Sequence, residues 1–150
     1  MTLRWMLAAF HLLALGIGLA AVWVRGRSLL AVLDRAGLER VFRADAVWGI
    51  AAVLWIGTGL WRLLGGVEKP TDYYLHNVAF ATKMALLVVI LLLEIQPMVT
   101  LISWRRRVAA GSPPDTRSAP WLAKISLIQA GIVVLMVFAA TAMARGIGER

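Results

Sequence analysis

The chain has 150 residues, of which 61% are hydrophobic and 16% are charged, and its mean hydropathy is +0.78. Because soluble domains are nearer half apolar, this composition excludes an ordinary soluble fold and favours a chain whose solvent is lipid. The formal net charge is +8 and cysteine is absent, which excludes disulfides, thiolate metal sites, iron-sulfur clusters and cysteine nucleophiles. The basic residues gather beside apolar runs, where they act as topology determinants, so a nucleic-acid partner is not indicated.

Four apolar runs are long enough to span a bilayer, since one crossing needs about 20 apolar residues. The first run, residues 5–24, has His11 as its only ionisable group, and we expect it to be retained rather than cleaved as a signal peptide. The other three runs are residues 46–64, 77–102 and 121–144. The sequence therefore predicts an all-α fold, in which residues 1–150 form one integral membrane domain of four transmembrane helices.

A charged, amphipathic stretch lies between the first two spans. Residues 28–44 place Leu30, Leu33 and Val41 on one helical face and most of their charged side chains away from it. This pattern predicts a short interfacial helix that lies on the membrane surface. Asp45 then suits the N-cap of the second span.

The basic residues outside the spans predict an orientation. The loops at 25–45 and 103–120 hold nine of them, against five at the opposite ends of the spans. Cytoplasmic loops carry the excess of Lys and Arg, so both termini are expected to face outward.

A group of polar and small residues shares one depth near the outer ends of the spans. At 1.5 Å per residue, His11 and Lys83 each lie about 10 Å inside the start of their own span. Residues 57–59, Gly-Thr-Gly, fall at a similar level, and Arg62 lies close to the end of the same span. We therefore predict a buried pocket in the outer leaflet, formed around His11, Lys83 and Arg62.

The third span carries a polar stripe. His76, Lys83 and Glu94 lie within about 40° of one another on a helix, and a lipid-facing charge is costly, so the stripe should face the bundle interior. Gln129 lies at a similar depth to Glu94, which predicts a hydrogen bond between them, with Arg25 or Arg27 as a further partner.

Each polar residue also has a structural interpretation that the sequence leaves open. His11 could join neighbouring helices instead of binding a ligand, and His76 could be solvated at the interface. Glu94 could serve packing or a proton path. Lys83 lies too deep to reach the surface easily along its stem, which favours a functional or paired role.

Three long segments resemble a family of bacterial membrane proteins designated domain of unknown function, family 2214: HLLALGIGLAAVWVRGR, WGIAAVLWIGTGLWR and YYLHNVAFATKMALLVVILLLEIQPMVTLISWR. The resemblance covers nearly the whole chain. It implies a multi-pass protein of the bacterial inner membrane, with both termini in the periplasm under the orientation above, and it implies no particular activity.

A more distant resemblance rests on fewer residues. The chain is similar to the HemJ-type protoporphyrinogen oxidases and the CopD-like copper proteins in three features. These are His11 followed by Arg27, a glycine-rich second span, and Lys83 early in the third span. The HemJ-type resemblance implies haem binding and activity at His11 and Lys83. On this hypothesis His11 would ligate the iron of haem b, and Lys83 and Arg62 would meet its propionates or supply a second ligand.

Two other functions remain open. A small metal or solute transporter could use His11, Met84, Met98 and Glu94 along a path, since soft ligands suit Cu(I). A non-enzymatic assembly component would use its polar groups only to hold helices together. Lipid is the expected partner in every case. The protein could also form a homo-oligomer or bind a second membrane protein. The sequence identifies no catalytic residues and does not decide whether the protein is an enzyme.

Overall fold

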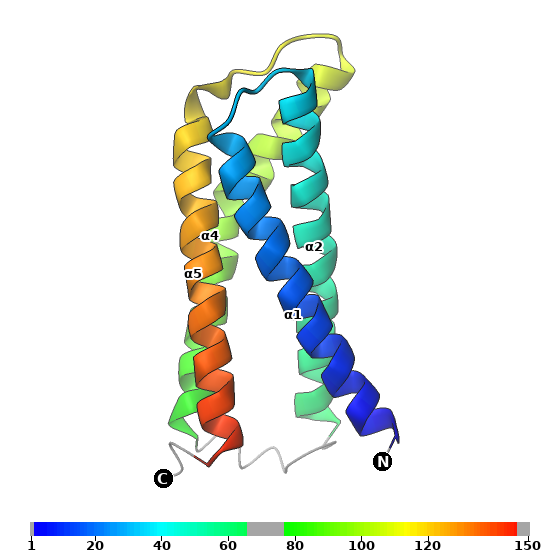
Figure 1. Cartoon of the computed structure of the whole chain (residues 1–150), viewed down its shortest axis with the longest axis vertical. Coiled ribbons are helices and arrows are strands. Elements are labelled where there is room, and N and C mark those ends of the chain that lie inside the picture. The colour runs from blue at the N-terminus through cyan, green and yellow to red at the C-terminus, as the bar shows by residue number, and fades with distance from the viewer. Residues whose placement is uncertain (1, 66–76, 147–150) are drawn as a thin grey trace.

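A computed structural model describes residues 2–65 and 77–146, with side chains from residue 5 onward. Four long helices, α1 Thr2–Leu29, α2 Arg35–Leu64, α4 Val78–Ala109 and α5 Ala119–Ala144, make up most of the chain (Figure 1). A short 3-10 helix, Thr116–Ser118, precedes α5. All four long helices are long and apolar enough to cross a membrane. The predicted all-α fold with four spans is therefore confirmed.

The helices run alternately up and down, so the start of α1 and the end of α5 lie at the same end of the molecule (Figure 1). We call this the terminal end and the opposite one the loop end. Helix α1 packs against both α2 and α5, and α5 also packs against α4. The four helices therefore form two pairs, α1 with α2 and α4 with α5, which are held together mainly by the contact between α1 and α5.

The predicted interfacial helix at residues 28–44 is wrong as a separate element. Helix α1 continues to Leu29, and α2 runs unbroken from Arg35. The buried positions Gly37, Val41 and Ala44 continue the face of α2 that is buried further along the helix. Because this face packs against the bundle, the charged stretch forms the first turns of α2 and not a separate helix. Asp34, not Asp45, is the N-cap of α2, and its Oδ1 accepts the Gly37 N–H at 2.7 Å.

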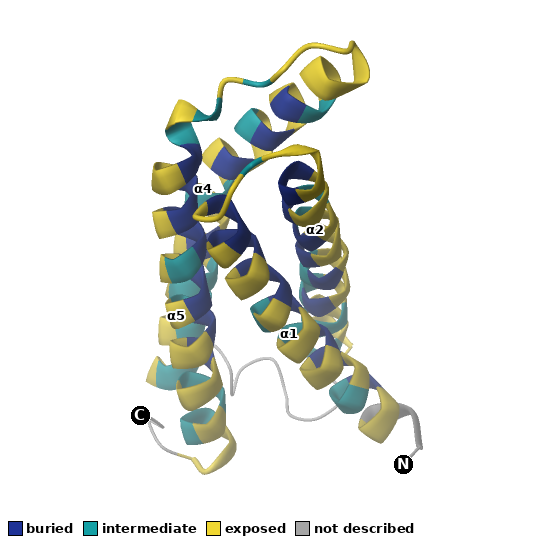
Figure 2. Cartoon of the chain, turned by 45° about the horizontal axis from the view of Figure 1, so that its top comes forward, coloured by how far each residue is buried: buried dark blue, intermediate teal, exposed yellow. Residues whose placement is uncertain are grey.

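Buried residues lie on the inner faces of the helices and exposed residues on the outer faces (Figure 2). The outer face carries large apolar side chains in the middle of the spans, such as Ile50, Val53 and Leu92. Such a surface is unfavourable in water but suits contact with lipid chains. The membrane itself therefore completes the environment of the bundle.

Small residues set how closely α1 approaches its neighbours. A Cβ placed on Gly26 would lie 2.9 Å from Cδ2 of Leu127 on α5, and one on Gly18 would lie 3.2 Å from the Trp48 ring on α2. Neither approach is compatible with a larger side chain unless the neighbour shifts. Helix α1 thus crosses α5 closely at Gly26 near the loop end and diverges from it toward the terminal end (Figure 1).

Candidate functional site

A pocket of about 470 Å³ lies near the terminal end and is lined by residues of all four helices. Most of the lining is apolar, with Leu15, Trp55, Phe80 and Met136 each coming from a different helix. Volumes of about 300 to 1,000 Å³ with apolar walls and a few polar groups are usual for small-molecule sites. The pocket thus lies among the three residues around which the sequence predicted one, His11, Lys83 and Arg62.

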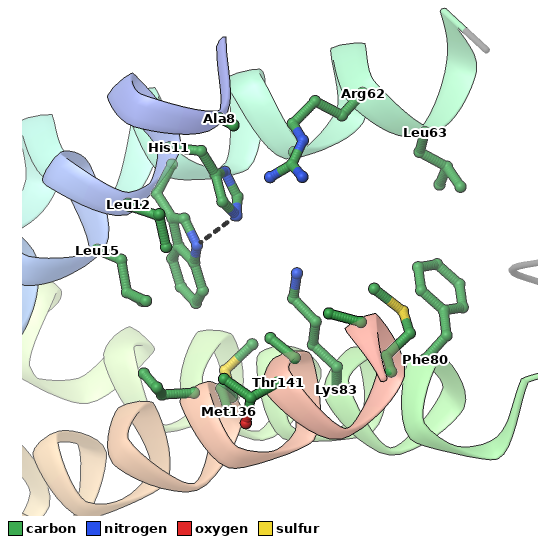
Figure 3. Close-up of a pocket in the computed structure, with 16 residues that line it drawn as sticks. Ala8, His11, Leu12, Leu15, Arg62, Leu63, Phe80, Lys83, Met136 and Thr141 are labelled. Carbon is green, nitrogen blue, oxygen red and sulfur yellow. Dashed lines mark hydrogen bonds between the residues drawn. The ribbon is translucent and has the colours of Figure 1, made fainter. Parts of the chain in front are cut away.

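Arg62 of α2 and Lys83 of α4 extend into this pocket from opposite sides, and the ends of both side chains point into the space between the helix pairs (Figure 3). Both residues are half-buried. They are the only charged residues among the described residues that line the pocket. In surroundings of low dielectric, two cations on facing walls would attract an acidic group strongly.

His11 also lines the pocket, but both of its ring nitrogens are engaged by α2. The Trp55 indole N–H donates to Nε2 of His11 at 3.1 Å (Figure 3), and Nδ1 lies 2.9 Å from Oγ1 of Thr58. Because an indole nitrogen can only donate, Nε2 is the acceptor, and the neutral ring carries its proton on Nδ1. The Thr58 hydroxyl accepts a hydrogen bond from this Nδ1–H and donates its own hydrogen to the Leu54 carbonyl at 2.7 Å.

This arrangement makes His11 a bridge between α1 and α2. Its ring also rests against Gly59, where an added Cβ would lie 3.1 Å from Cε1. Trp55 was not singled out from the sequence. The signal was available, since Trp55, Thr58, Gly59 and Arg62 recur at helical spacing on one face of α2.

Metal ligation has little direct support in the described residues. Among residues 2–65 and 77–146, no group of three or more His, Cys, Asp or Glu side chains could hold a metal ion. Iron could bind Nε2 of His11 only if Trp55 released it. The residues of the predicted transport path are also separated, because Met98 is exposed on the outer face of α4 and Glu94 belongs to a different cluster from His11.

That second cluster surrounds Arg25, whose side chain is 0% exposed. A guanidinium has five N–H donors, and all five of them are used. Nε donates to Ser126 Oγ at 3.1 Å. Nη1 donates to Asp45 and Glu94 at 2.8 and 2.7 Å, and Nη2 donates to Glu94 and Gln129 at 2.8 and 2.9 Å.

The partners of Arg25 are themselves connected. Gln129 donates to Glu94 at 2.8 Å, as the sequence predicted, and Trp48 donates to the same carboxylate at 3.0 Å. Arg105 donates to the second oxygen of Asp45 at 2.8 Å. The network, which we call the arginine cluster, joins α1, α2, α4 and α5 nearer the loop end than the pocket.

The saturation of these contacts favours a structural role for Glu94 over a proton path. A fully hydrogen-bonded ionic network inside a bundle holds its members in place, and removing one member deprives its partners of a hydrogen bond or a counter-charge. Arg25, and not Arg27, is the partner of Glu94. Arg27 is exposed and takes no part in the cluster, and His76 lies outside the described residues.

Comparisons with known proteins identify one match. A family model described as a predicted membrane protein, DUF2214, matches residues 3–148. No curated protein and no solved structure matches the chain. The family description assigns a membrane location and no chemistry, and the likeness to HemJ-type and CopD-like proteins stays a prediction.

Proposed function

Because the chain belongs to the DUF2214 family of predicted membrane proteins, whose description names no activity, we propose a function from the pocket itself. The protein binds, inside the membrane, an apolar molecule that carries acidic groups. The ligand that we propose is a porphyrin, with haem b as the redox-active member of that class. The observation that carries the proposal is the placement of Arg62 and Lys83 in a pocket whose walls are otherwise largely apolar.

Arg62 and the deeper apolar lining are separated along the axis of α2. Arg62 lies two residues before the end of α2, whereas Trp55 on the same helix is seven residues deeper, which is about 10 Å. Leu15 and Met136 line the pocket together with Trp55. A ligand with acids on one edge and an apolar body therefore fits with its acids toward the terminal end. A porphyrin has this form, since both of its propionates lie on one edge of the ring.

In this arrangement the protein recognises the porphyrin mainly by its carboxylates and less by its iron. Nε2 of His11 already accepts a hydrogen bond from Trp55, so ligation would first have to break that bond. The chemistry that haem would supply is electron transfer. The residues of the chain would bind the propionates, enclose the ring and exclude water from it.

The test is a titration of the detergent-purified protein with haem and, separately, with metal-free protoporphyrin. We expect both to bind. Replacing Arg62 or Lys83 by Gln should weaken the binding of both ligands about tenfold or more, because a hydrogen bond to a charged group contributes about 1.5 to 3 kcal/mol. Lys124→Gln is the matched control, since Lys124 is exposed and lies over the Trp121 ring, outside the pocket.

Each other outcome is informative. Binding of haem but not of protoporphyrin, abolished by His11→Ala, would mean that iron ligation carries recognition, as the distant resemblance implies. Failure of both ligands to bind would contradict the proposed function.

We also propose that the protein lies in the bacterial inner membrane with both termini in the periplasm. The support is the excess of Arg in the segments 25–45 and 103–120, which combine helix ends and connecting loops at the loop end. The pocket would then belong to the outer leaflet.

A further inference from the structure

We propose that the ligand enters the pocket sideways, from the hydrocarbon region of the bilayer, through an opening between α1 and α5. This inference rests on the proposed function, because it concerns the route to the same pocket. It predicts that the ligand is taken from the lipid phase and not from water.

The first support is the divergence of α1 from α5. The two helices are in close contact at Gly26 and Leu127. Leu12 on α1 and Thr141 on α5 each lie fourteen residues from that contact toward the terminal end, which is about 21 Å. Buried side chains such as Val133 fill the space between the helices in the packed half. Nearer the terminal end the two helices diverge (Figure 1). Leu12 and Thr141 both line the pocket there.

The second support is the exposure of side chains on the rim. Leu12 and Val137 both line the pocket, yet they are 64% and 38% exposed. His11, which lines the same pocket, is only 6% exposed. Leu12 and Val137 belong to helices that are candidate spans, so their outer surfaces face lipid chains. The pocket wall is therefore continuous with the lipid-facing surface at this edge.

The third support is that the rim is apolar and partly built from small residues. Ala8 of α1 and Ala140 of α5 line the pocket beside Leu12 and Val137. An apolar ring could pass here without exposing itself to water. Lipids also keep their charged groups at the interface and their apolar parts inside, which is the orientation that Arg62 and Lys83 require. A sideways entry would thus keep the acids in one leaflet and would not carry them across the middle of the hydrocarbon core, where charge is most costly.

Because the sequence has no cysteine, a single introduced cysteine can be labelled specifically. The Leu12→Cys variant is compared with Leu13→Cys, because Leu13 is similarly exposed on α1 but does not line the pocket. Each protein is reconstituted into phosphatidylcholine vesicles and labelled with a bulky thiosulfonate that dithiothreitol removes. Metal-free protoporphyrin is then supplied in a second population of vesicles, and its transfer to the protein is followed by fluorescence.

We expect the label on the Leu12→Cys variant to slow loading severalfold, and dithiothreitol to restore the original rate. The same label on the Leu13→Cys variant should have no effect. Conversely, the smaller side chain of the Leu12→Ala variant should widen the opening and increase the rate of loading.

The outcomes separate the route from the site. If the unlabelled Leu12→Cys variant binds porphyrin and its label leaves the rate unchanged, the sideways route is wrong while the proposed function stands. A label that lowers the final amount bound without changing the rate would place position 12 inside the site and would also overturn the route. If the unlabelled protein binds no porphyrin, the proposed function fails and the route fails with it.

Discussion

At the scale of single residues, polar side chains in the spans of this protein are placed by what they bond to. His11 shares both ring nitrogens with α2, and Arg25 uses every donor that it has. In the hydrocarbon region an unsatisfied polar group costs several kcal/mol, so such residues are fixed once their partners are in place.

Trp55→Phe tests the bridge at His11. The change keeps an aromatic ring but removes the N–H that His11 accepts, and interhelical hydrogen bonds in membranes contribute about 0.6 to 1.7 kcal/mol. We expect a loss of about 1 kcal/mol in the free energy of unfolding, measured by denaturation in mixed detergent micelles. Because Nε2 is then available, haem should gain affinity relative to metal-free protoporphyrin. Trp61→Phe is the control, since Trp61 is exposed on the same helix. Equal gains for both porphyrins would contradict the assignment of Nε2 as the acceptor.

Arg25→Ala and Arg27→Ala form a second matched pair. Loss of Arg25 leaves Glu94 without its counter-charge and Asp45 with Arg105 alone, and breaking a buried ion pair costs about 3 to 5 kcal/mol. Arg27 is exposed, so its removal should change stability by about 0.5 kcal/mol or less. The measurement is the midpoint of thermal unfolding in detergent. Similar midpoints for the two variants would show that the arginine cluster contributes little to stability.

The sequence predicted part of this residue-level picture. Depth arithmetic correctly paired Glu94 with Gln129, because both positions are counted from the same end of the bundle. Depth alone could not choose between Arg25 and Arg27, which point to different faces of α1. Gly18, Ala21 and Arg25 follow helical spacing on the face that packs inward, so this row of small residues could have distinguished Arg25 from Arg27.

At the scale of elements, the close crossing of α1 and α5 depends on Gly26. Leucine at that position would collide with Leu127 and with the carbonyl of Ala123, which lies 3.3 Å from an added Cβ. We expect Gly26→Leu to lower the free energy of unfolding by about 1 to 3 kcal/mol, the usual cost of overpacking. Gly16→Leu is the control on the same helix, because nothing lies within 4 Å of its added Cβ. Chemical denaturation in detergent would measure both, and equal stability would contradict the crossing.

The prediction for the start of α2 was wrong because it rested on local charge and amphipathicity alone. Residues 35–44 are charged enough to look interfacial, yet Val41 and Ala44 share a buried face with Trp48 and Trp55. Asp45 sits between these two parts and looked like a cap. It is instead the counter-ion of Arg25 and Arg105, a role that no local pattern reveals because its partners come from other helices.

At the scale of the whole molecule, the two ends of the bundle differ in how they are held. Toward the loop end, the arginine cluster links all four helices through ionic hydrogen bonds. Toward the terminal end, α1 diverges from α5 and the pocket lies between the helix pairs. The two helix pairs are therefore held together toward the loop end and separated toward the terminal end. This arrangement leaves room for a ligand while the arginine cluster keeps the bundle together.

The orientation of the bundle is a prediction that single cysteines can check. Ser112→Cys places a thiol at the loop end and Arg145→Cys places one at the terminal end, and both positions are exposed. In intact spheroplasts, a membrane-impermeant maleimide should label the Arg145→Cys variant but reach the Ser112→Cys variant only after permeabilisation. The reverse labelling would invert the topology and move the pocket to the cytoplasmic leaflet.

The arginine cluster also constrains the order in which the chain can assemble. Asp45 follows Arg25 by 20 residues, Glu94 by 69, and Ser126 and Gln129 by 101 and 104. A guanidinium that lacks these partners is costly to remove from water, so we expect Arg25 to stay near the membrane surface until they are present. Three of the five donor bonds of Arg25 go to Asp45 and Glu94, whereas the two to Ser126 and Gln129 can form only after α5 has been synthesised. The last span therefore supplies the final hydrogen bonds to Arg25 of the first span.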